Sequence, residues 1–397
     1  MGNQKHILLG ICGSISAYKT LEFVRLLRKN NYTVTCMLSE HAKLFVTKES
    51  LSILSEGDVI DSLHSDTGIK HLDLSKTCDA FLILPGSANT LSKLSLGLAD
   101  DIISTTWLNF TGPKLIAPSM HTDMWENALI QEHVNRLIDH GCFVIPPALG
   151  PLACGDYGAG RLPELSTIYT VLISSLFSKE KLLAGKNIFI TAGPMQVVID
   201  PVRVLQNKSS GNLGHLLAHM CAALGANVHL LTSKTISDPQ CLSQVDVFDS
   251  FDSFKEALKQ SSHADLFFMS AAVSDYTYDG SLKKLARQDQ VTLTLKGTKD
   301  LLKESKSYQK ATCCRVGFCL IDDLTKLDKA KAKKKNKDVD LMLVNTPSAF
   351  GAPSRDVVLI DSENKTRALN ETPLEVLCFD LIQTSLAAYL KKAQKAL

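Results

Sequence analysis

The stretch HILLGICGSISAYKTLEFVRLLRKN, residues 6–30, determines the fold expected for the first half of the chain. HILLGI is an apolar run, CGSISA is a turn of small residues, and apolar residues follow at helical spacing. The runs TVTCML, AFLILP, KLIAP and CFVIPP read as further buried strands, with helical patterns between them. Strands that alternate with helices form a parallel sheet covered on both faces. We therefore predict an α/β domain of the three-layer, Rossmann-like type.

The same pattern starts again in the second half. Residues 178–186, SKEKLLAGK, are polar and charged with one Gly, which is typical of a linker or a domain edge. NIFITAGP, SSGNLGHLLAHMCAALG and NVHLLTS then follow as strand, Gly loop with helix, and strand, about the length of a mononucleotide-binding unit. DLFFMSAAV and DLMLVN add two apolar runs, each introduced by Asp. We predict two such domains with parallel sheets, residues 1–180 and 186–397.

Composition excludes several classes of protein. Of the 397 residues, 45% are hydrophobic, which is enough for large cores with buried strands. Lys and Arg total 43 against 41 Asp and Glu, a net charge of +2. A general nucleic-acid binder needs a clear basic excess, so that class is disfavoured. Anionic small molecules stay open, because they need only a local field.

The cysteines and the apolar runs indicate the compartment. The eleven cysteines are scattered and lack metal-type spacing. The apolar run from Ile7 is short and broken by Gly10 and Gly13, unlike a signal peptide. No stretch is long enough to cross a bilayer. We expect a reduced, cytoplasmic protein with no membrane and no nucleic-acid partner.

Two motifs in the first half could bind a phosphate. Gly13 and Ser14 lie where the first strand turns into a helix, and a helix N-terminus favours negative charge. The same Gly turn also occurs for packing alone. Ser87, Asn89 and Thr90 follow the strand AFLIL, at the sheet edge where ligands collect. They could equally cap the next helix, which is the commoner outcome for such residues taken singly.

Two further motifs contain residues that could face a ligand. APSMHTDMW, residues 117–125, has two Met and a Trp that could wall a flat ring or simply fill the core. LACGDYGAGRLPE, residues 152–164, has three Gly and is too irregular for a helix or strand. This pattern predicts a mobile flap that carries Cys154 as a candidate reactive thiol.

Together these motifs carry a resemblance to a known family. ICGSISAYK, SEHAKLF, HLDL, PGSANT, PSMHTDMW and LACGDYGAGRLPE occur in the order seen in flavin-dependent cysteine decarboxylases. The set spans nearly all of residues 6–170 and resembles the decarboxylase half of the bifunctional coenzyme A biosynthesis proteins. The resemblance implies that the chain binds FMN and decarboxylates 4'-phosphopantothenoylcysteine.

The resemblance also implies roles for single residues. His71 in HLDL matches the catalytic histidine, and Cys154 matches the cysteine that donates a proton to the intermediate. Met124 keeps the family residue type, whereas His121 stands where the family has an Asn that holds the substrate carboxylate. An imidazole can still donate to a carboxylate. The residues implied for FMN binding are Gly13, Ser14, Ser39, Ser87, Ala88, Asn89, Thr90 and Ser119.

The second half resembles the ligase half of the same proteins over residues 186–346. IDPVR, the N-x-SSG loop and SAAVSDY carry this resemblance. It implies a CTP- and Mg²⁺-dependent ligation of 4'-phosphopantothenate with cysteine, with Asn207 in the substrate site. The metal ligands stay unassigned. The residues implied for CTP binding are Ser270, Ala271, Asp275, Lys283, Phe318, Lys333 and Lys337.

The ligase half departs from the family at several positions. Met195 and Val197 replace a hydroxyl and a carboxylate, and Ile321 replaces a Glu. Ser281 stands where a lysine contacts the triphosphate, so Lys283 or its neighbour Lys284 would have to supply that charge. An alternative is therefore that only the decarboxylase works, with a ligase domain that serves regulation or oligomerisation.

Two other interpretations carry less support. A flavoprotein that only binds its cofactor would not need both His71 and Cys154. A Rossmann dehydrogenase is disfavoured because neither Gly loop is GxGxxG with an acidic residue after the second strand. The resemblance further implies a homo-oligomer, with trimeric decarboxylase domains and dimeric ligase domains.

Overall fold

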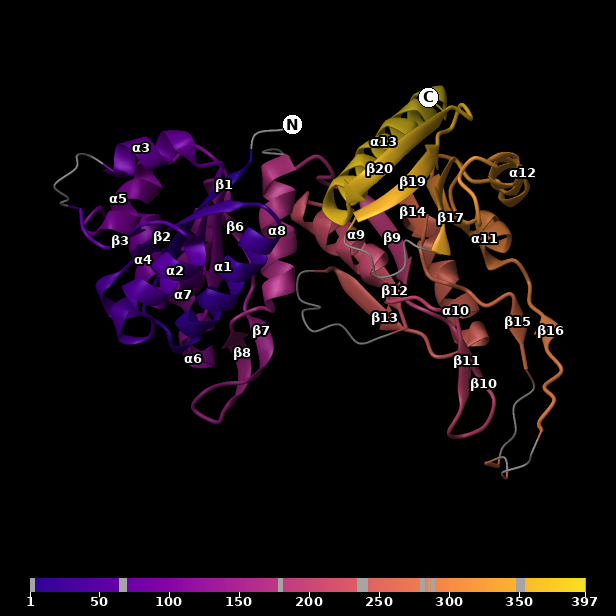
Figure 1. The fold of residues 1–397 in the computed structure, drawn as a ribbon, viewed down its shortest axis with the longest axis horizontal. Helices are drawn as coiled ribbons and strands as arrows, with labels where there is room; N and C mark the ends of the chain where they lie inside the picture. The colour runs from indigo at the N-terminus through magenta and orange to yellow at the C-terminus, as the bar shows by residue number, and fades with distance from the viewer. Residues whose placement is uncertain are drawn as a thin grey trace. The chain divides into compact units, whose positions relative to one another are not determined.

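The protein forms two compact units, residues 1–180 and 181–397 (Figure 1). The structure is a computed structural model, and for Lys70, His71 and Ser354 it describes the backbone alone. The boundary between the units lies inside the polar stretch 178–186. The described residues are 4–63, 70–177, 181–233, 242–278, 283–284, 286, 290–347 and 354–396.

The first unit has a six-stranded sheet in the order β3-β2-β1-β4-β5-β6, and every pair is parallel. The predicted parallel α/β fold is confirmed here. The order reverses between β1 and β4, and ligands of such sheets bind at the carboxyl ends beside this reversal. The strands are β1 (His6–Ile11), β2 (Thr33–Leu38), β3 (Val59–Ile60), β4 (Ala80–Gly86), β5 (Lys114–Pro118) and β6 (Phe143–Val144).

Helices cover this sheet, and a hairpin projects from it (Figure 1). Every residue of β4 is buried, and Phe81 from this strand packs edge-to-face against Trp107 and Phe110. The helices are α1 (Lys19–Lys29), α2 (Lys48–Ser55), α3 (Lys70–Thr77), α4 (Ala88–Leu96), α5 (Ile102–Asn109), α6 (Thr122–Trp125), α7 (Ala128–Asp139) and α8 (Leu165–Phe177), with the short 3-10 helices η1 (Ile15–Tyr18) and η2 (Glu40–Leu44); the hairpin is β7 (Ala148–Pro151) with β8 (Tyr157–Arg161).

The second unit repeats this topology and extends it. Its eight-stranded sheet has the order β13-β12-β9-β14-β17-β18-β19-β20, and its first six strands are parallel in the relative order seen in the first unit. The strands are β9 (Asn187–Ala192), β12 (Asn227–Thr232), β13 (Gln244–Val247), β14 (Leu266–Met269), β17 (Cys314–Leu320), β18 (Leu341–Asn345), β19 (Ser354–Ile360) and β20 (Thr366–Pro373).

The last two strands correct the expectation of a wholly parallel sheet. β19 pairs antiparallel with β18, and β20 pairs antiparallel with β19. A parallel partner needs a crossover of about a dozen residues or more. The connections 346–353 and 361–365 are shorter than that, so the chain returns in the opposite direction.

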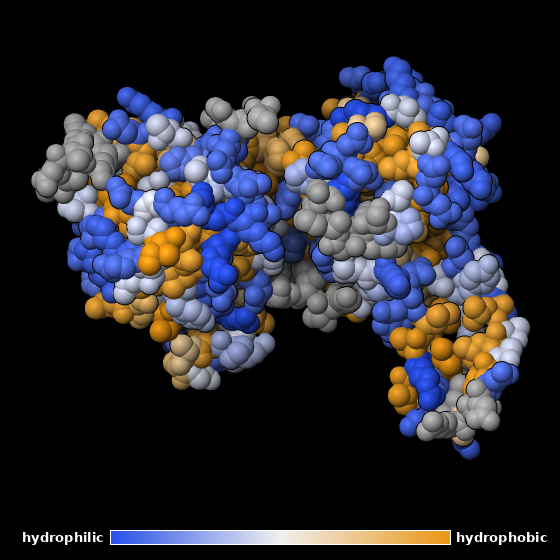
Figure 2. All heavy atoms as spheres, in the orientation of Figure 1, coloured by the Kyte–Doolittle hydropathy of each residue, from blue (hydrophilic) through white to orange (hydrophobic). Residues whose placement is uncertain are grey.

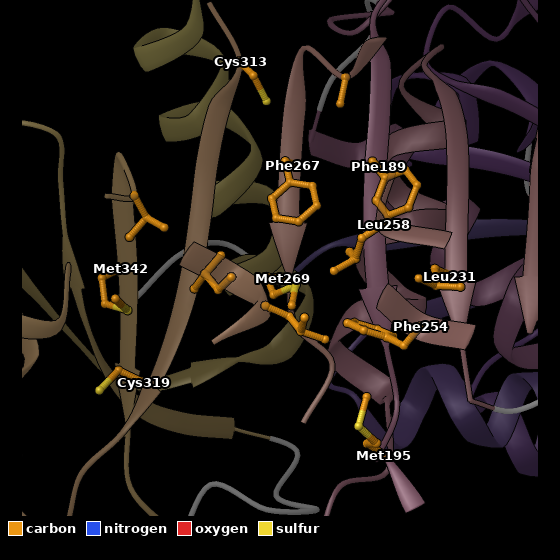
Figure 3. Close-up of a cluster of buried hydrophobic side chains, with 14 of the residues drawn as sticks. Phe189, Met195, Leu231, Phe254, Leu258, Phe267, Met269, Cys313, Cys319 and Met342 are labelled. Carbon is orange, nitrogen blue, oxygen red and sulfur yellow. The ribbon is translucent and has the colours of Figure 1, made fainter. Parts of the chain in front are cut away.

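Helices and two antiparallel arms complete the second unit. Figure 3 shows its core, where Phe189 and Phe267 stack with ring centroids 5.9 Å apart. Apolar side chains such as Val202, Val204 and Tyr276 are exposed on the arms, where Figure 2 shows a hydrophobic surface. The helices are α9 (Asn212–Ala223), α10 (Phe251–Leu258), α11 (Leu301–Glu304), α12 (Asp328–Lys337) and α13 (Leu374–Ala396), with η4 (Lys259–His263) and η5 (Ser305–Tyr308); the arms are β10 (Gln196–Val198) with β11 (Val204–Gln206) and β15 (Tyr276–Thr277) with β16 (Lys296–Gly297).

An aspartate clamp recurs at the amino ends of three strands. In each case the residue before a strand accepts, through its carboxylate, a backbone N–H at the start of the neighbouring parallel strand at 2.8 Å. Its own N–H donates back to the carbonyl of that same residue. The two bonds close a ring that fixes how the strands begin. The pairs are Asp79 with His6, Asp265 with Asn187, and Asp340 with Arg315.

Among the helices in the described ranges, none combines the length and apolar character that crossing a membrane requires.

We expect Asp79→Asn to lower the unfolding free energy of the first unit by roughly 1–3 kcal/mol at neutral pH, because the carboxylate accepts charge-assisted hydrogen bonds. Burial raises the pKa of Asp79, but Lys5 and the His6 N–H outweigh it and hold the pKa below 3.8. The stabilisation is therefore present above that pH and is lost as the pH falls through the folded pKa.

Urea unfolding followed by tryptophan fluorescence measures this effect, because both tryptophans, Trp107 and Trp125, lie in the first unit. Asp58→Asn changes an exposed aspartate of the same unit and is the matched control. Equal losses in Asp79→Asn and Asp58→Asn would contradict the clamp.

Candidate functional sites

Serines follow four of the strands at the carboxyl edge of the first sheet. Ser14 follows β1, Ser39 follows β2, Ser87 follows β4 and Ser119 follows β5. The first three are helix N-caps whose oxygens accept a backbone N–H from the turn that they start. The structure thus brings together, beside the reversal of strand order, residues that the sequence analysis placed in the FMN site.

The loops at this edge approach one another closely. The Ser16 hydroxyl donates to the Ser119 hydroxyl at 2.8 Å, which joins the loop after β1 to the loop after β5. A Cβ added to Gly13 would lie 2.5 Å from the Cβ of His41, so a side chain there would force the loops after β1 and β2 apart. Only small residues are compatible with this edge, and they leave hydroxyls and backbone N–H groups for a ligand.

The PGSANT motif caps the N-terminus of helix α4, the role that the sequence analysis favoured. The Ser87 hydroxyl accepts the Thr90 N–H at 3.2 Å and lies 2.9 Å from the Thr90 hydroxyl. Ala88 is buried and Asn89 is exposed in the same first turn of α4. Capping is therefore present, and phosphate binding by this turn stays a prediction.

The stretch 152–164, expected to be too irregular for a helix or strand, contains the turn of the β7–β8 hairpin, with Cys154 in it, and the strand β8 itself, because Tyr157–Arg161 pair antiparallel with β7. Cys154 is exposed, while the other described cysteines are buried. Burial raises the pKa of the buried thiols, as for Cys12, whose pKa is about 12. Among the described thiols, solvent access thus singles out Cys154, as a reactive group requires.

The structure places His121 and Cys154 around a third residue, Asp156. The Nε2 atom of His121 lies 2.9 Å from Oδ2 of Asp156, and the Cys154 thiol donates to the same oxygen at 3.4 Å. The hydrogen bond that the Asp156 carboxylate accepts raises the pKa of His121, and the same bond lowers the pKa of Asp156. Nδ1 of His121 accepts the N–H of Asp123 as the cap of α6.

These contacts bear on the role predicted for His121. Both ring nitrogens are engaged inside the chain, so binding a substrate carboxylate requires His121 to exchange a partner. Met124, in α6, is 47% exposed and open to a ligand. The sequence analysis did not single out Asp156, although its position two residues after Cys154 in a Gly-rich flap was a signal. His71 lies in α3, and its side chain is outside the described residues.

In the second unit, a cavity of about 700 Å³ opens at the carboxyl edge of the sheet. It collects all but one of the residues that the sequence analysis proposed for this half. Lys283 is described and exposed, but it does not line the cavity. The predicted residues that line it are Asn207, Ser270, Ala271, Asp275, Phe318, Lys333 and Lys337.

Close backbone approaches place helix α9 against this cavity. Gly211, just before α9, has φ +79°, and a Cβ there would lie 3.1 Å from the backbone of Gly193. A Cβ on Gly214 would lie 2.5 Å from Oγ of Ser270. The first turn of α9 therefore presents its N–H groups beside the ends of β9 and β14, an arrangement suited to an anion.

The cavity also has cationic side chains. Lys333 and Lys337 lie four residues apart on α12, and Nζ of Lys337 is 3.4 Å from a carboxylate oxygen of Asp300. The sequence analysis missed Arg355 of β19, which lines the same cavity. Its Nε is buried and has no hydrogen-bond partner among the described residues. A buried, unsatisfied guanidinium nitrogen is costly, and an anionic ligand would satisfy it.

Of the residues that the sequence analysis took as departures from the family pattern, those that the structure describes lie in the core or pack against it. Met195 is 1% exposed and belongs to the hydrophobic cluster that also contains Phe254 and Leu231, and Ile321 packs against that cluster (Figure 3). Val197 is also buried. The apolar side chains of Met195, Val197 and Ile321 are thus buried or partly buried, and none of the three lines the cavity. Ser281 lies outside the described residues.

Comparison with known proteins gives matches to both halves. Residues 1–177 match the family described as Flavoprotein. Residues 183–387 match the family described as DNA/pantothenate metabolism flavoprotein C-terminal domain. The coenzyme A biosynthesis bifunctional protein CoaBC of Haemophilus influenzae is 32% identical over 402 residues, which covers 98% of this chain and 99% of that protein.

The chain belongs to the bifunctional coenzyme A biosynthesis family. The family membership predicted from the motifs is thereby confirmed. The CoaBC protein of Bacillus subtilis is also 32% identical, with 96% of this chain and 97% of that protein covered. Among solved structures, a mutant PPC decarboxylase complexed with pantothenoylaminoethenethiol is 29% identical over 44% of this chain and 100% of that chain, with a TM-score of 0.41.

In this member of the bifunctional family, Gly160 holds the flap against the loop after β5. Its carbonyl accepts the Met120 N–H at 3.1 Å, and an added Cβ would lie 2.2 Å from the Met120 carbonyl oxygen. We expect Gly160→Ala to displace the flap and to lower the unfolding free energy by roughly 1–3 kcal/mol, the usual cost of overpacking. Thermal unfolding and limited proteolysis of residues 149–161 measure the two effects.

Gly150→Ala is the matched control in the same hairpin, because its added Cβ would meet only the Arg161 side chain at 3.4 Å. A Gly160→Ala protein as stable and as protease-resistant as Gly150→Ala would show that the flap does not depend on this contact.

Proposed function

We propose that the chain joins 4'-phosphopantothenate to cysteine with CTP and then decarboxylates the 4'-phosphopantothenoylcysteine with FMN. Residues 1–180 would carry the decarboxylase and residues 186–397 the ligase. The observation that carries this proposal is the relationship to the bifunctional CoaBC protein of Haemophilus influenzae over 98% of the chain. The assembled cavity of the second unit and the exposed thiol of the first support it.

The carboxyl edge of the first sheet fits FMN. Gly13 allows the close approach of loops, and the hydroxyls of Ser14, Ser39, Ser87 and Ser119 follow adjacent strands beside the reversal of strand order. Ala88, Asn89 and Thr90 complete the turn that would bind the phosphate. FMN, when bound, supplies the reversible two-electron oxidation of the substrate cysteine, which protein side chains cannot provide.

The chain's own residues would bind the substrate and move its protons. His71 suits proton transfer close to neutral pH, because histidine side chains in general have a pKa near ~6.5. Cys154 is exposed on the flap, and its hydrogen bond to Asp156 orients the thiol proton that it would donate. His121 and Met124, from the loop after β5 and from α6, would contact the substrate. Asp156 would act as a positioning residue.

In the second unit, the cavity would bind CTP with Mg²⁺ beside 4'-phosphopantothenate. Ser270, Ala271, Asp275 and Phe318 would contact the nucleotide. Lys333 and Lys337, on one face of α12, would offset the charge of the triphosphate. Asn207 would contact 4'-phosphopantothenate. Its amide donates to the carbonyls of Ala272 and Val273, which fixes this side chain at the cavity wall.

A second candidate is a decarboxylase whose ligase domain serves regulation or oligomerisation. It is favoured by Met195, Val197 and Ile321, which put apolar side chains, buried at Met195 and Val197 and partly buried at Ile321, where the resemblance implies polar ones. The location of these residues in the core rather than in the cavity supports the bifunctional proposal instead, because the cavity keeps its polar and cationic lining.

The proposal includes a cytoplasmic homo-oligomer, with trimeric decarboxylase units and dimeric ligase units. Its support in this chain is the hydrophobic surface of the arms of the second unit, with Val198, Val202 and Leu205 exposed (Figure 2). Exposed apolar patches of this kind are commonly covered by another protein surface.

We expect purified protein to be yellow with one FMN per chain. With 4'-phosphopantothenate, cysteine, CTP and Mg²⁺ it should form both the ligation product and the decarboxylated product in a mass-spectrometric assay. Cys154→Ser should release CO₂ but fail to deliver the final product, because its proton donor is gone. Wild type that forms the ligation product but no decarboxylated product would refute the decarboxylase. Wild type that forms no ligation product would leave the decarboxylase-only candidate.

A calorimetric titration of CTP with Mg²⁺ locates the charge that the family lysine supplies. We expect Arg355→Ala to weaken CTP binding about tenfold to a hundredfold, since a charge-assisted contact is worth roughly 1.5–3 kcal/mol. Arg355→Lys, which keeps the charge, should recover part of this loss. Arg367→Ala changes an exposed arginine of β20 and is the control. If Lys283→Ala weakens CTP binding and Arg355→Ala does not, Lys283 rather than Arg355 supplies the positive charge that contacts the triphosphate.

A further inference from the structure

One carboxylate oxygen in the first unit receives two different donors. Oδ2 of Asp156 lies 2.9 Å from Nε2 of His121 and accepts the thiol proton of Cys154 at 3.4 Å. All three potential ligand atoms lie within 4.8 Å of one another. An imidazole nitrogen and a thiol sulfur therefore lie beside the same carboxylate oxygen, with hydrogen-bonding protons between them.

We propose that His121, Cys154 and Asp156 form a binding site for a divalent cation of the zinc class. Nitrogen, sulfur and carboxylate oxygen are the ligands that zinc takes in proteins, at about 2.0–2.3 Å. In a tetrahedral site such ligand atoms are about 3.5 Å apart. Two of the three separations, 2.9 and 3.4 Å, are close to this value, and the third is within 4.8 Å, so side-chain movements of the order of an ångström are enough to admit the ion.

The protons in the cluster have defined destinations when the cation binds. Cys154 releases its thiol proton to solvent and binds as the thiolate. A neutral His121 moves its proton from Nε2 to Nδ1, which frees Nε2 for the metal. The protonated Nδ1 no longer accepts the N–H of Asp123, and instead it can donate to Oδ2 of the same residue, which lies 3.5 Å away. A metal-bound histidine usually donates its second N–H to such a carboxylate.

The backbone holds the two sides of the site together. His121 precedes α6, whereas Cys154 and Asp156 lie in the β7–β8 hairpin. Gly160 joins the two elements through its hydrogen bond with Met120. The hairpin and the loop are thus in contact before any ion binds, which lowers the ordering that binding requires.

The site belongs to this chain rather than to the family pattern. The family has Asn at the position of His121, and an amide is a much weaker zinc ligand than an imidazole. Cys154 is 3.4 Å from Asp156 and exposed, so a fourth position stays open to water. One consequence rests on the proposed function: a bound cation removes the thiol proton of Cys154 and would inhibit the decarboxylase reversibly.

The test measures binding without any substrate. Full-length protein is stripped with a chelator, titrated with Zn²⁺ and alkylated with iodoacetamide, and the modified fraction of Cys154 is read by peptide mass spectrometry. Zn²⁺ should protect Cys154 in the wild type. His121→Asn, which restores the family residue, should raise the half-protecting Zn²⁺ concentration more than tenfold, and Asp123→Asn should raise it by about tenfold to a hundredfold at most. Protection should weaken from pH 8 to pH 6, because protons compete for the ligands.

His140→Asn removes an exposed histidine of the same unit outside the cluster and should leave the protection unchanged. Thermal unfolding of each variant establishes that it is folded. Equal protection in wild type and His121→Asn, or an unprotected Cys154 in wild type, would overturn the site. Neither result depends on whether the protein ligates or decarboxylates anything, so the proposed function is tested separately by its products.

Discussion

The aspartate clamp sets the geometry on which both units depend. A carboxylate before one strand and a backbone N–H of its neighbour are 2.8 Å apart in all three pairs, and a backbone bond returns the other way. In parallel sheets, a fixed start also fixes where the strands end on the opposite edge. The serines after β1 and β4 and the cavity beside β9 and β14 lie at that edge. Register set at one side of the sheet thus positions chemistry at the other.

Much of the fold could be predicted from the sequence because buried parallel strands are continuous apolar runs. The runs HILLGI, TVTCML and NIFITA correspond to β1, β2 and β9. Two strands, β17 and β20, were not predicted because neither is a continuous apolar run. β17 contains Arg315, whose charge interrupts the apolar run. Arg315 is nevertheless buried, because the Gln309 side chain and the Leu302 carbonyl accept hydrogen bonds from its guanidinium. β20 is largely exposed and polar, so its sequence does not differ from that of a loop.

The candidate sites could be predicted as sets of residues but not as arrangements. The strand-end serines and most of the lining of the second cavity were implied by the resemblance of the motifs to a known family, and the structure places these motifs after strands and on α12. Arg355 had no such signal, and for Asp156 the local signal beside Cys154 did not show its contact with His121. Asp156 meets a residue 35 positions away, and Arg355 reaches its cavity from an antiparallel strand that the sequence did not predict. Proximity created by folding leaves no local pattern.

The cavity of the second unit has one wall that tolerates change and one that does not. Around α9, Gly193, Gly211 and Gly214 lie so close to other chain segments that any larger residue would collide. α12 and β19 contribute long cationic side chains to the lining, Lys333, Lys337 and Arg355, and these reach the cavity without the close backbone approaches seen at the glycines. A change in the charge or length of the cavity lining is therefore easier to introduce on this second wall than around α9.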